Sequence, residues 1–259
     1  MEVHHHAHTA RKKWTHYLWE FIMLFLAVYS GFLAENIREH RIEHKREEKM
    51  MASFLLDLDK DSVIICKFQK RLTDHINGLN ILMEALRKPL NTKNNIAWLY
   101  ITYMKYGMTM QNISFSENVV SQLKFGGGLR LIKEDSVVSG FNEYEAVKKT
   151  LTIDAEEIKR LSIDIEEQQA NRVFDLTSDA AILKLLDAPG FYLNSDSLMT
   201  VAMKDTLTVH MFDEGKILLF QNSIRSIKSL EFDFLHFLSS ALIINRDLYY
   251  TIIKEYHLQ

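Results

Sequence analysis

The sequence has few of the residues that interrupt regular structure. Its 259 residues include 9 glycines and 2 prolines, about 4% together, where average usage would give about 12%. A chain with so few helix breakers is predicted to be mostly helical. The single cysteine, Cys66, excludes a fold held together by internal disulfides.

An excess of charge of one sign is also absent. Lys and Arg number 31 and Asp and Glu number 34, which gives a net charge of -3. This balance supplies no bulk electrostatic reason to bind nucleic acid, and none is expected as a partner. Apolar residues make up 47% of the chain, which excludes an intrinsically disordered protein.

One long apolar block stands near the N-terminus. Its uncharged part, residues 21–34, would be about 21 Å long as a helix, which is shorter than the roughly 30 Å hydrocarbon core of a bilayer. Extending it back to Trp14 gives about 31 Å and includes Glu20. The sequence therefore predicts a transmembrane helix over 14–36 that follows a basic, His-rich tail over 1–13.

Two alternatives to a membrane anchor are a cleaved signal peptide and a buried helix of a soluble domain. Only a cut after Ser30, with Val28 two residues before it, resembles the small-residue rule for signal cleavage. A soluble helix would usually carry a polar stripe, and residues 21–28 have none. Aromatic residues typical of a membrane interface crowd the start of the block: Trp14, Tyr17 and Trp19.

Small residues recur on one face of the predicted span. Ala27, Gly31 and Ala34 follow at intervals of four and three, and Glu20 lies seven residues before Ala27 on the same face. Small residues at this spacing let two membrane helices approach closely, and a carboxyl group can form a hydrogen bond across such a contact. We expect a homo-oligomer that associates through this face, although Gly and Ala are common in any membrane helix.

A charged stalk and an amphipathic helix are predicted over 37–88. Five glutamates and five basic residues alternate between Glu35 and Lys49, as in a solvated helix with charge pairs. Apolar residues then recur at intervals of three and four, as in an amphipathic or coiled-coil helix, at Ile65, Phe68, Leu72, Ile76, Leu79, Met83 and Leu86. Pro89 ends this pattern, so one nearly continuous helix is expected from about Trp14 to Lys88.

The remaining residues, 89–259, are predicted to form a helical domain. The expected helices cover 143–173 and, as one or two helices, 216–259, whereas 91–95 reads as a polar loop and 187–215 as an irregular or strand-like segment. The three glycines at 126–128 lack the Lys-Ser/Thr of a phosphate-binding loop. They predict a helix end and turn, with Leu123 and Phe125 packing on the core.

Histidines raise the question of metal binding. His4, His5, His6 and His8 form a tract whose imidazoles suit transition metals, although the first residues of a chain are usually poorly ordered. The segment HRIEH, with His40 and His44, matches a pattern of inverted zinc peptidases, but it lies in a run already rich in His and Glu and beside no evident cleft. No cofactor is predicted.

Two further features are given structural interpretations. Asp57, Asp59 and Asp61 alternate, and a helix is expected to spread them around its surface, without the glycine and terminal glutamate of a calcium loop. Cys66 lies among Val63, Ile64, Ile65 and Phe68, which predicts an inert, packed thiol. No nucleophile with an evident base partner is present, so catalysis is not expected.

Three segments carry a resemblance to a known family: the opening MEVHHHAHTARKKWTHYLWEF, the middle SQLKFGGGLRLIK and the closing TIIKEYHLQ. Together they resemble uncharacterised single-span membrane proteins from Bacteroidetes, over most of the chain and most specifically at residues 1–50. The resemblance implies that the His tract is native, that the span is retained, and that the helical domain lies on the periplasmic side of the inner membrane. It implies no activity.

The positive-inside rule does not decide the orientation. Arg11, Lys12 and Lys13 precede the span, and four basic residues follow it within about a dozen positions: Arg38, Arg41, Lys45 and Arg46. The hypothesis favoured by the sequence is a non-enzymatic, oligomeric scaffold or sensor anchored in the lipid bilayer. The alternatives are a metal-handling accessory protein that uses the His tract and a membrane-anchored zinc hydrolase built on HRIEH.

Overall fold

The computed structural model describes residues 14–107, 112–125, 127–165, 168, 170–174 and 214–258. Within these ranges the chain is all-α, as predicted. Three helices are long: α1 (Trp14–Ala85), α4 (Asp135–Ile165) and α8 (Glu214–Tyr256). The shorter elements are α2 (Lys93–Tyr106), α3 (Asn118–Phe125), the 3₁₀ helix η1 (Gly128–Leu131) and α5 (Asn171–Val173).

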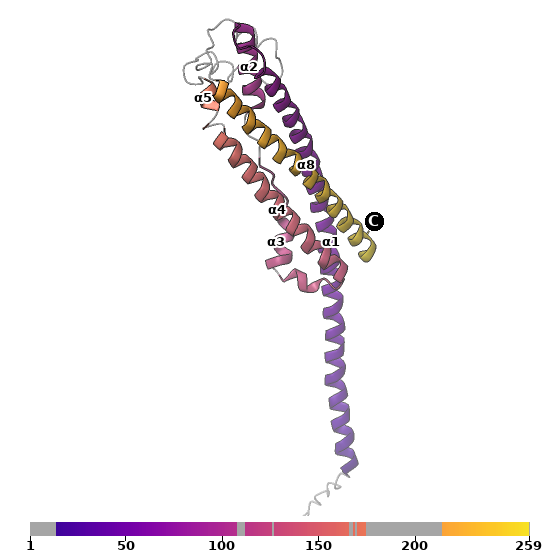
Figure 1. Cartoon of the computed structure of the whole chain (residues 1–259). Coiled ribbons are helices and arrows are strands. Elements are labelled where there is room, and N and C mark those ends of the chain that lie inside the picture. Colours follow the sequence, from indigo (N-terminus) through magenta and orange to yellow (C-terminus); the bar gives the residue numbers. More distant parts are fainter. Residues whose placement is uncertain are drawn as a thin grey trace, which may run out of the picture.

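Helix α1 runs unbroken through 72 residues, a length of about 108 Å. Its first part stands apart from the other elements, and its second part enters the bundle (Figure 1). The first buried residue of α1 is Glu47 and the last is Ala85. The predicted continuity of span, stalk and amphipathic helix is therefore confirmed, with an end three residues before Lys88.

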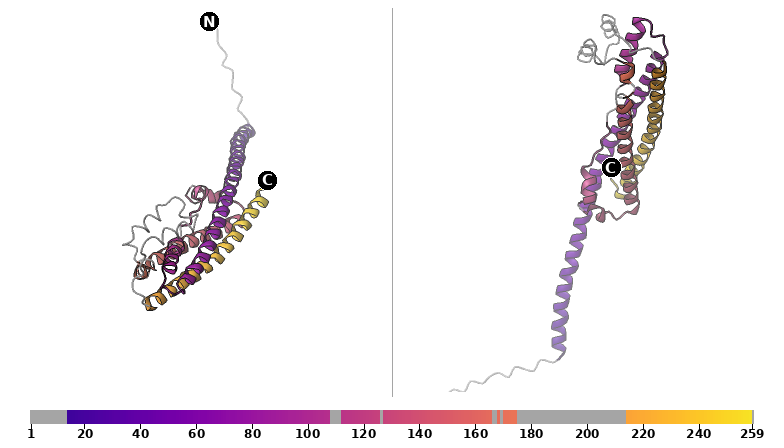
Figure 2. Two further views of the ribbon diagram at one scale, coloured as in Figure 1. Left: turned by 90° about the horizontal axis from the view of Figure 1, so that it is seen from above. Right: turned by 60° about the vertical axis from the view of Figure 1, so that its left-hand side comes forward.

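The bundle consists of the second half of α1, α4 and α8, with α8 running in the opposite direction to the other two (Figures 1 and 2). Helix α2 folds back against the end of α1, whereas α3 and η1 lie at the base of the bundle, where the bare part of α1 emerges. The C-terminal end of α8 lies near this base as well. All the described tertiary packing is thus at one end of the long helix.

Apolar side chains fill the bundle in three clusters along its axis. The base is built around Leu58, Phe141 and Leu248, the middle around Leu72, Leu151 and Leu238, and the top around Leu82, Tyr100 and Phe220. In α1, Leu72 belongs to the predicted stripe, and Leu58 and Leu82 lie seven residues before Ile65 and three after Leu79, on the same face. The stripe is therefore the buried face of the helix.

Several predicted boundaries are wrong. Helix α4 begins at Asp135 and not at residue 143, because the carbonyl of Glu134 accepts the first helical bonds and Asp135 places a negative charge in the first turn. The polar loop expected over 91–95 is shorter, because the Thr92 hydroxyl caps α2 by accepting a hydrogen bond from the amide of Asn95. Residues 216–256 belong to one helix, α8. The strand-like segment predicted near 187–215 lies outside the described residues, apart from its last two residues in α8.

The glycine turn forms where the sequence places it. Gly127 has φ +70°, a left-handed conformation that suits glycine, between the end of α3 and η1. Leu123 is fully buried as expected. Phe125 is 88% exposed, so the prediction that it packs on the core is wrong: α3 turns that side outward.

Candidate functional surfaces

The apolar start of α1 is exposed on all sides. It is the one described helix long and apolar enough to cross a membrane, and no part of its most apolar window is buried by the rest of the chain. Large side chains such as Phe21, Leu24 and Phe32 are each more than 60% exposed. Exposure of such an apolar surface to water is unfavourable in free energy, whereas contact with hydrocarbon is not.

The face with small residues is open. A side chain added at Gly31 would meet nothing within 4 Å, so the helix surface between Ala27 and Ala34 is open to contact by another helix or by lipid. Glu20, on the same face, lies 3.3 Å from the ring of His16 in its own helix. The structure thus shows the four residues of the predicted association face together on one exposed surface.

The histidines of the stalk interact with neighbouring carboxylates. His40 lies 3.9 Å from Glu43, and His44 lies 3.6 Å from both Glu47 and Glu48. Both rings are exposed on a single helix, and the described part of the chain brings no group of three metal-ligating side chains together, here or elsewhere. The tract with His4, His5, His6 and His8 lies outside the described residues.

Two carboxylates that the sequence interpretation assigned to the surface are buried. Asp57 and Asp61 are 3% and 1% exposed, and only Asp59 of the three faces outward. Asp57 accepts a hydrogen bond from the amide of Val119 at 3.2 Å, and Asp61 accepts one from the amide of Ser116 at 2.8 Å. Asp57 therefore caps α3 from another helix, because Val119 is in the first turn, where amides have no intrahelical partner.

Asp61 is also connected to α4. It accepts a hydrogen bond from the Tyr144 hydroxyl at 2.9 Å, and the ammonium group of Lys148 lies 3.8 Å away. Lys148 is itself 2.7 Å from Glu145. Each charge in this cluster has a partner, so its geometry is that of a structural junction between α1, α3 and α4.

The surroundings shift the pKa values of these groups in opposite directions. Burial raises the pKa of the Asp61 carboxyl, and the hydrogen bonds from Ser116 and Tyr144 and the positive charge of Lys148 only partly oppose this shift. Burial acts in the same direction on Asp57, but hydrogen bonds from Val119, Ser116 and Lys60 outweigh it and lower the pKa below its usual value. Burial raises the pKa of Tyr144 as well, so its hydroxyl remains a donor.

Further polar side chains join α1 to α8. At the base, Glu47 accepts hydrogen bonds from the Tyr256 hydroxyl at 2.6 Å and from the amide of Lys133 at 3.1 Å. Higher in the bundle, the ring of His75 lies 2.9 Å from Glu231, which is fully buried. These contacts fix the height of α8 along α1, which apolar packing alone defines less sharply.

Cys66 is exposed, so the prediction of a packed thiol is wrong. Ile65 and Phe68 face the core, and Val63, in the same apolar run, is 50% exposed. The run is wider than the stripe that α1 buries. Cys66 therefore presents its thiol on the outside of the bundle.

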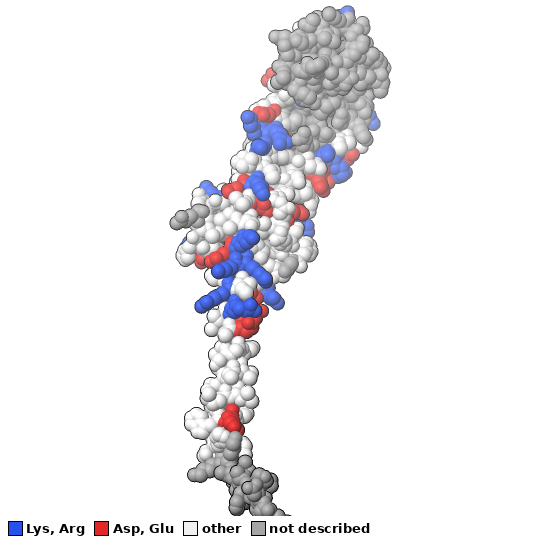
Figure 3. All heavy atoms as spheres, turned by 180° about the vertical axis from the view of Figure 1, so that it is seen from behind, with Lys and Arg blue, Asp and Glu red and all other residues white. Residues whose placement is uncertain are grey.

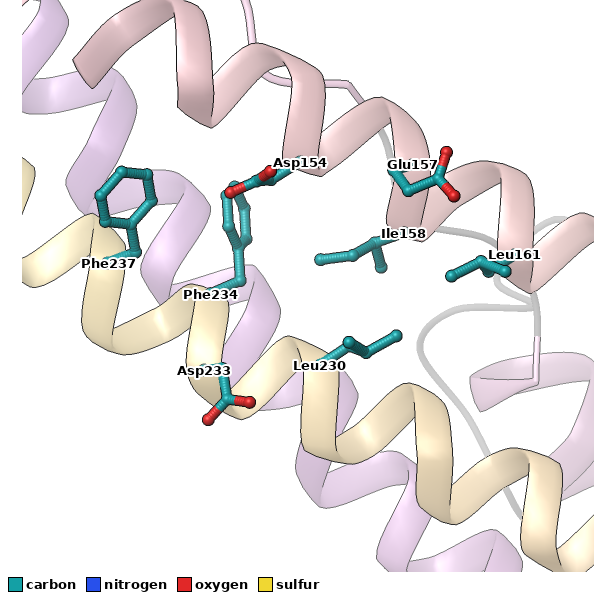
Figure 4. A pocket seen from close by; sticks show the side chains of 8 residues that line it. All are labelled: Asp154, Glu157, Ile158, Leu161, Leu230, Asp233, Phe234 and Phe237. Carbon is teal, nitrogen blue, oxygen red and sulfur yellow. The ribbon is translucent and has the colours of Figure 1, made fainter. Parts of the chain in front are cut away.

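A groove of about 380 Å³ lies between α4 and α8. Ile158 and Leu161 from α4 and Leu230 from α8 point toward one another across it, whereas the carboxylates of Glu157 and Asp233 point away from its centre (Figure 4). Glu157 forms an ion pair with Arg160 at 2.5 Å, and this bond lowers its pKa. The groove offers apolar contact and contains no activated nucleophile or base.

The site residues that sequence reasoning missed are Asp57 and Asp61 with their partners on α3 and α4. The sequence signal for them is their spacing of four residues on the helix face that also carries Leu58 and Ile65, because this is the buried face of α1.

In comparisons with family models, curated proteins and solved structures, nothing matched this chain.

Proposed function

We propose that the protein is a single-pass membrane protein whose helical bundle serves as a non-enzymatic, oligomeric scaffold or sensor. The observation that carries the proposal is the unbroken α1, which is apolar and bare over its first turns and forms part of the bundle core over its last ones. A helix without a hinge transmits a rotation or shift of the bundle to the membrane segment, and the reverse. This is the mechanical connection that a scaffold or sensor needs.

Self-association is the second part of the proposal. The face with Ala27, Gly31 and Ala34 is open, and membrane helices with small residues at this spacing cross at about 40° with close backbone contact. Such a crossing at Gly31 would separate two copies progressively beyond Ala34. The bundles would then have room side by side, and the basic residues of the two stalks would not be forced together.

The chemistry of the described side chains supports a non-enzymatic role. The buried carboxylates accept hydrogen bonds from backbone amides and hydroxyls and so position α3, α4 and α8. The α4–α8 groove is mainly apolar. Such a surface supports binding and does not activate a substrate.

The test of association is sedimentation or light scattering of the full chain in detergent over a wide concentration range. The wild type should dissociate on dilution, and Gly31→Leu should weaken association at least about tenfold by blocking close approach. Tyr29→Leu, about 160° away from Gly31 around the helix, is the control and should behave as wild type. A wild type that is monomeric at every concentration would contradict the oligomeric proposal.

We further propose an inner-membrane location with the bundle on the periplasmic side, as the family resemblance implies. Cys66 offers a direct test because it is the single cysteine of the chain and is exposed on the bundle. A membrane-impermeant maleimide should label it in intact spheroplasts. Labelling that appears only after lysis would place the bundle in the cytoplasm, and Cys66→Ser is the background control.

A further inference from the structure

The stalk between the span and the bundle separates its charges onto two faces. Arg38, Arg41 and Lys45 follow at intervals of three and four, which places them on one side of α1. Glu39, Glu43 and Glu47 follow at intervals of four on the other side. Seen from behind, basic side chains gather a little above the uncharged part of the helix, with acidic side chains below and beside them (Figure 3). Although the stalk contains equal numbers of acidic and basic residues, three of its basic residues therefore share one face.

This basic face begins where the apolar span ends. Arg38 lies four residues after Ala34, a rise of about 6 Å, and Lys45 lies about 16 Å beyond Ala34. Helical side chains slant toward the N-terminus of their helix, which for α1 is the direction of the membrane. All three cationic groups can thus reach the headgroup layer or lie within about one Debye length of it.

The same residues line a shallow recess. Ala34, Ile37 and Ile42 are its apolar part, and the recess has a volume of about 400 Å³ together with the basic side chains and, at its upper end, His44 and Glu48. Ile37 and Ile42 are 53% and 40% exposed. An apolar floor beside a cationic group suits a molecule with a phosphate and a hydrocarbon portion.

The cationic groups are available for such a ligand. Arg38 donates two hydrogen bonds to Glu35, from Nε at 3.0 Å and from Nη2 at 2.5 Å, and this exposed pair leaves its Nη1 group for a further acceptor. Within the described ranges, Arg41 and Lys45 form no ion pair with a carboxylate. Glu48 is the one carboxylate among the residues that line the recess, so the recess as a whole has an excess of positive charge.

We propose that Arg38, Arg41 and Lys45 bind the phosphates of anionic phospholipid headgroups in the adjoining leaflet. The guanidinium groups suit phosphate oxygens, the lysine adds a longer-range charge, and Ala34, Ile37 and Ile42 contact the glycerol region of the lipid. The proposal goes beyond the proposed function and rests only on its membrane-spanning part. It holds for either orientation and with or without self-association.

The test is native mass spectrometry of the full chain from mixed micelles with equal amounts of phosphatidylglycerol and phosphatidylcholine. The wild type should retain phosphatidylglycerol in preference, and the variant R38Q/R41Q/K45Q should bind it at least about tenfold less well, since each cationic residue near a membrane surface contributes about a factor of five. The control K67Q/K70Q/R87Q removes the same charge from exposed positions in the bundle and should retain the preference. Conservative R38K/R41K/K45R should retain most of it.

Equal retention by the wild type and R38Q/R41Q/K45Q would overturn the proposal, provided that circular dichroism shows the same helicity. Competition by millimolar inorganic phosphate as effective as that by phosphatidylglycerol would also overturn it, because the site would then bind free anions. Extraction of the wild type from membranes by alkaline carbonate would contradict the span itself, and so separates a failure of the anchor from a failure of the lipid site.

Discussion

Residues 14–46 and 47–85 belong to one helix and lie in two different surroundings. The first part is exposed and has Glu20 as its only charged residue up to Ala34, after which it becomes highly charged, whereas the second buries one stripe against α2, α3 and α8. Backbone geometry is the same in both. Only the second part of the helix is therefore fixed by packing in the bundle. The exposed surface of the first part suits contact with a bilayer and with other molecules.

The largest expected effect comes from replacing a leucine by alanine, and it should differ between the two parts of α1. Leu58 is fully buried and Leu24 is 68% exposed. Leu58→Ala should lower the free energy of unfolding of the bundle by about 2–5 kcal/mol, because it leaves a cavity. Leu24→Ala should leave it nearly unchanged. Chemical denaturation in detergent, followed by circular dichroism, measures both, and equal losses would mean that the two parts are not distinct.

The buried carboxylates should differ from each other in their pH dependence. Asp57→Asn should cost about 2 kcal/mol at pH 7, because a charged acceptor of the Val119 amide is lost. The folded-state pKa of Asp57 is lowered, so its stabilising contribution is present above the unfolded-state pKa and is lost as the pH falls through the folded-state value. The variant should therefore approach wild-type stability only in acid.

The contribution of Asp61 to the free energy of unfolding should change with pH in the opposite direction. Its folded-state pKa is raised, so ionisation costs stability as the pH rises through that value, and the protonated form is favoured below it. Asp61→Asn should thus destabilise less than Asp57→Asn at pH 7. Denaturation curves between pH 3 and pH 8 give the free energy of unfolding of each variant relative to wild type. A larger loss of stability for Asp61→Asn than for Asp57→Asn at pH 7 would contradict the opposite directions of the two pKa shifts.

A smaller effect is expected from a methyl group added to each part. A side chain at Gly78 would overlap the ring of Tyr106, whereas Gly31 has open space. Gly78→Ala should destabilise by about 1 kcal/mol, because overpacking exceeds the gain in helix propensity. Gly31→Ala should not lower bundle stability. Thermal unfolding in one detergent compares them, and a stabilised Gly78→Ala variant would contradict the close approach of α1 and α2.

The smallest expected effect is at the outer face of the second part. Cys66→Ser should change the free energy of unfolding by no more than about 0.5 kcal/mol, because the thiol is exposed. Denaturation under reducing conditions measures this change. A loss above 1 kcal/mol would indicate that the thiol is packed after all.

Much of the fold could be predicted from local patterns. The apolar block, the charged run and the stripe from Ile65 to Leu86 each depend on residues within a few turns of one another, and they predict one continuous helix. Helix α4 begins eight residues before the predicted start and contains Gly140, where a side chain would clash with Leu248 of α8. Close packing between two distant helices accounts for a glycine that local propensity disfavours.

The candidate surfaces also differ in whether they depend on one helix or on segments far apart in the chain. The face with Ala27, Gly31 and Ala34 is predicted from spacing, because it lies on one helix. The basic face after it also lies on one helix, but there the sequence pattern predicts only charge pairs. The roles of Asp57 and Asp61 are not evident from spacing, since their partners Ser116, Val119 and Tyr144 lie 55 to 83 residues further along the chain.

Local sequence patterns are sufficient to predict that the chain is helical, that one helix is apolar enough to cross a bilayer, and that this helix continues without a break. These properties follow from the hydrophobicity and propensity of neighbouring residues. Which face of α1 is buried depends on the packing of the bundle, which places Asp57 and Asp61 inside and Cys66 and Val63 outside. The physical reason is that burial depends on where α3, α4 and α8 pack, and those contacts join segments far apart in the chain.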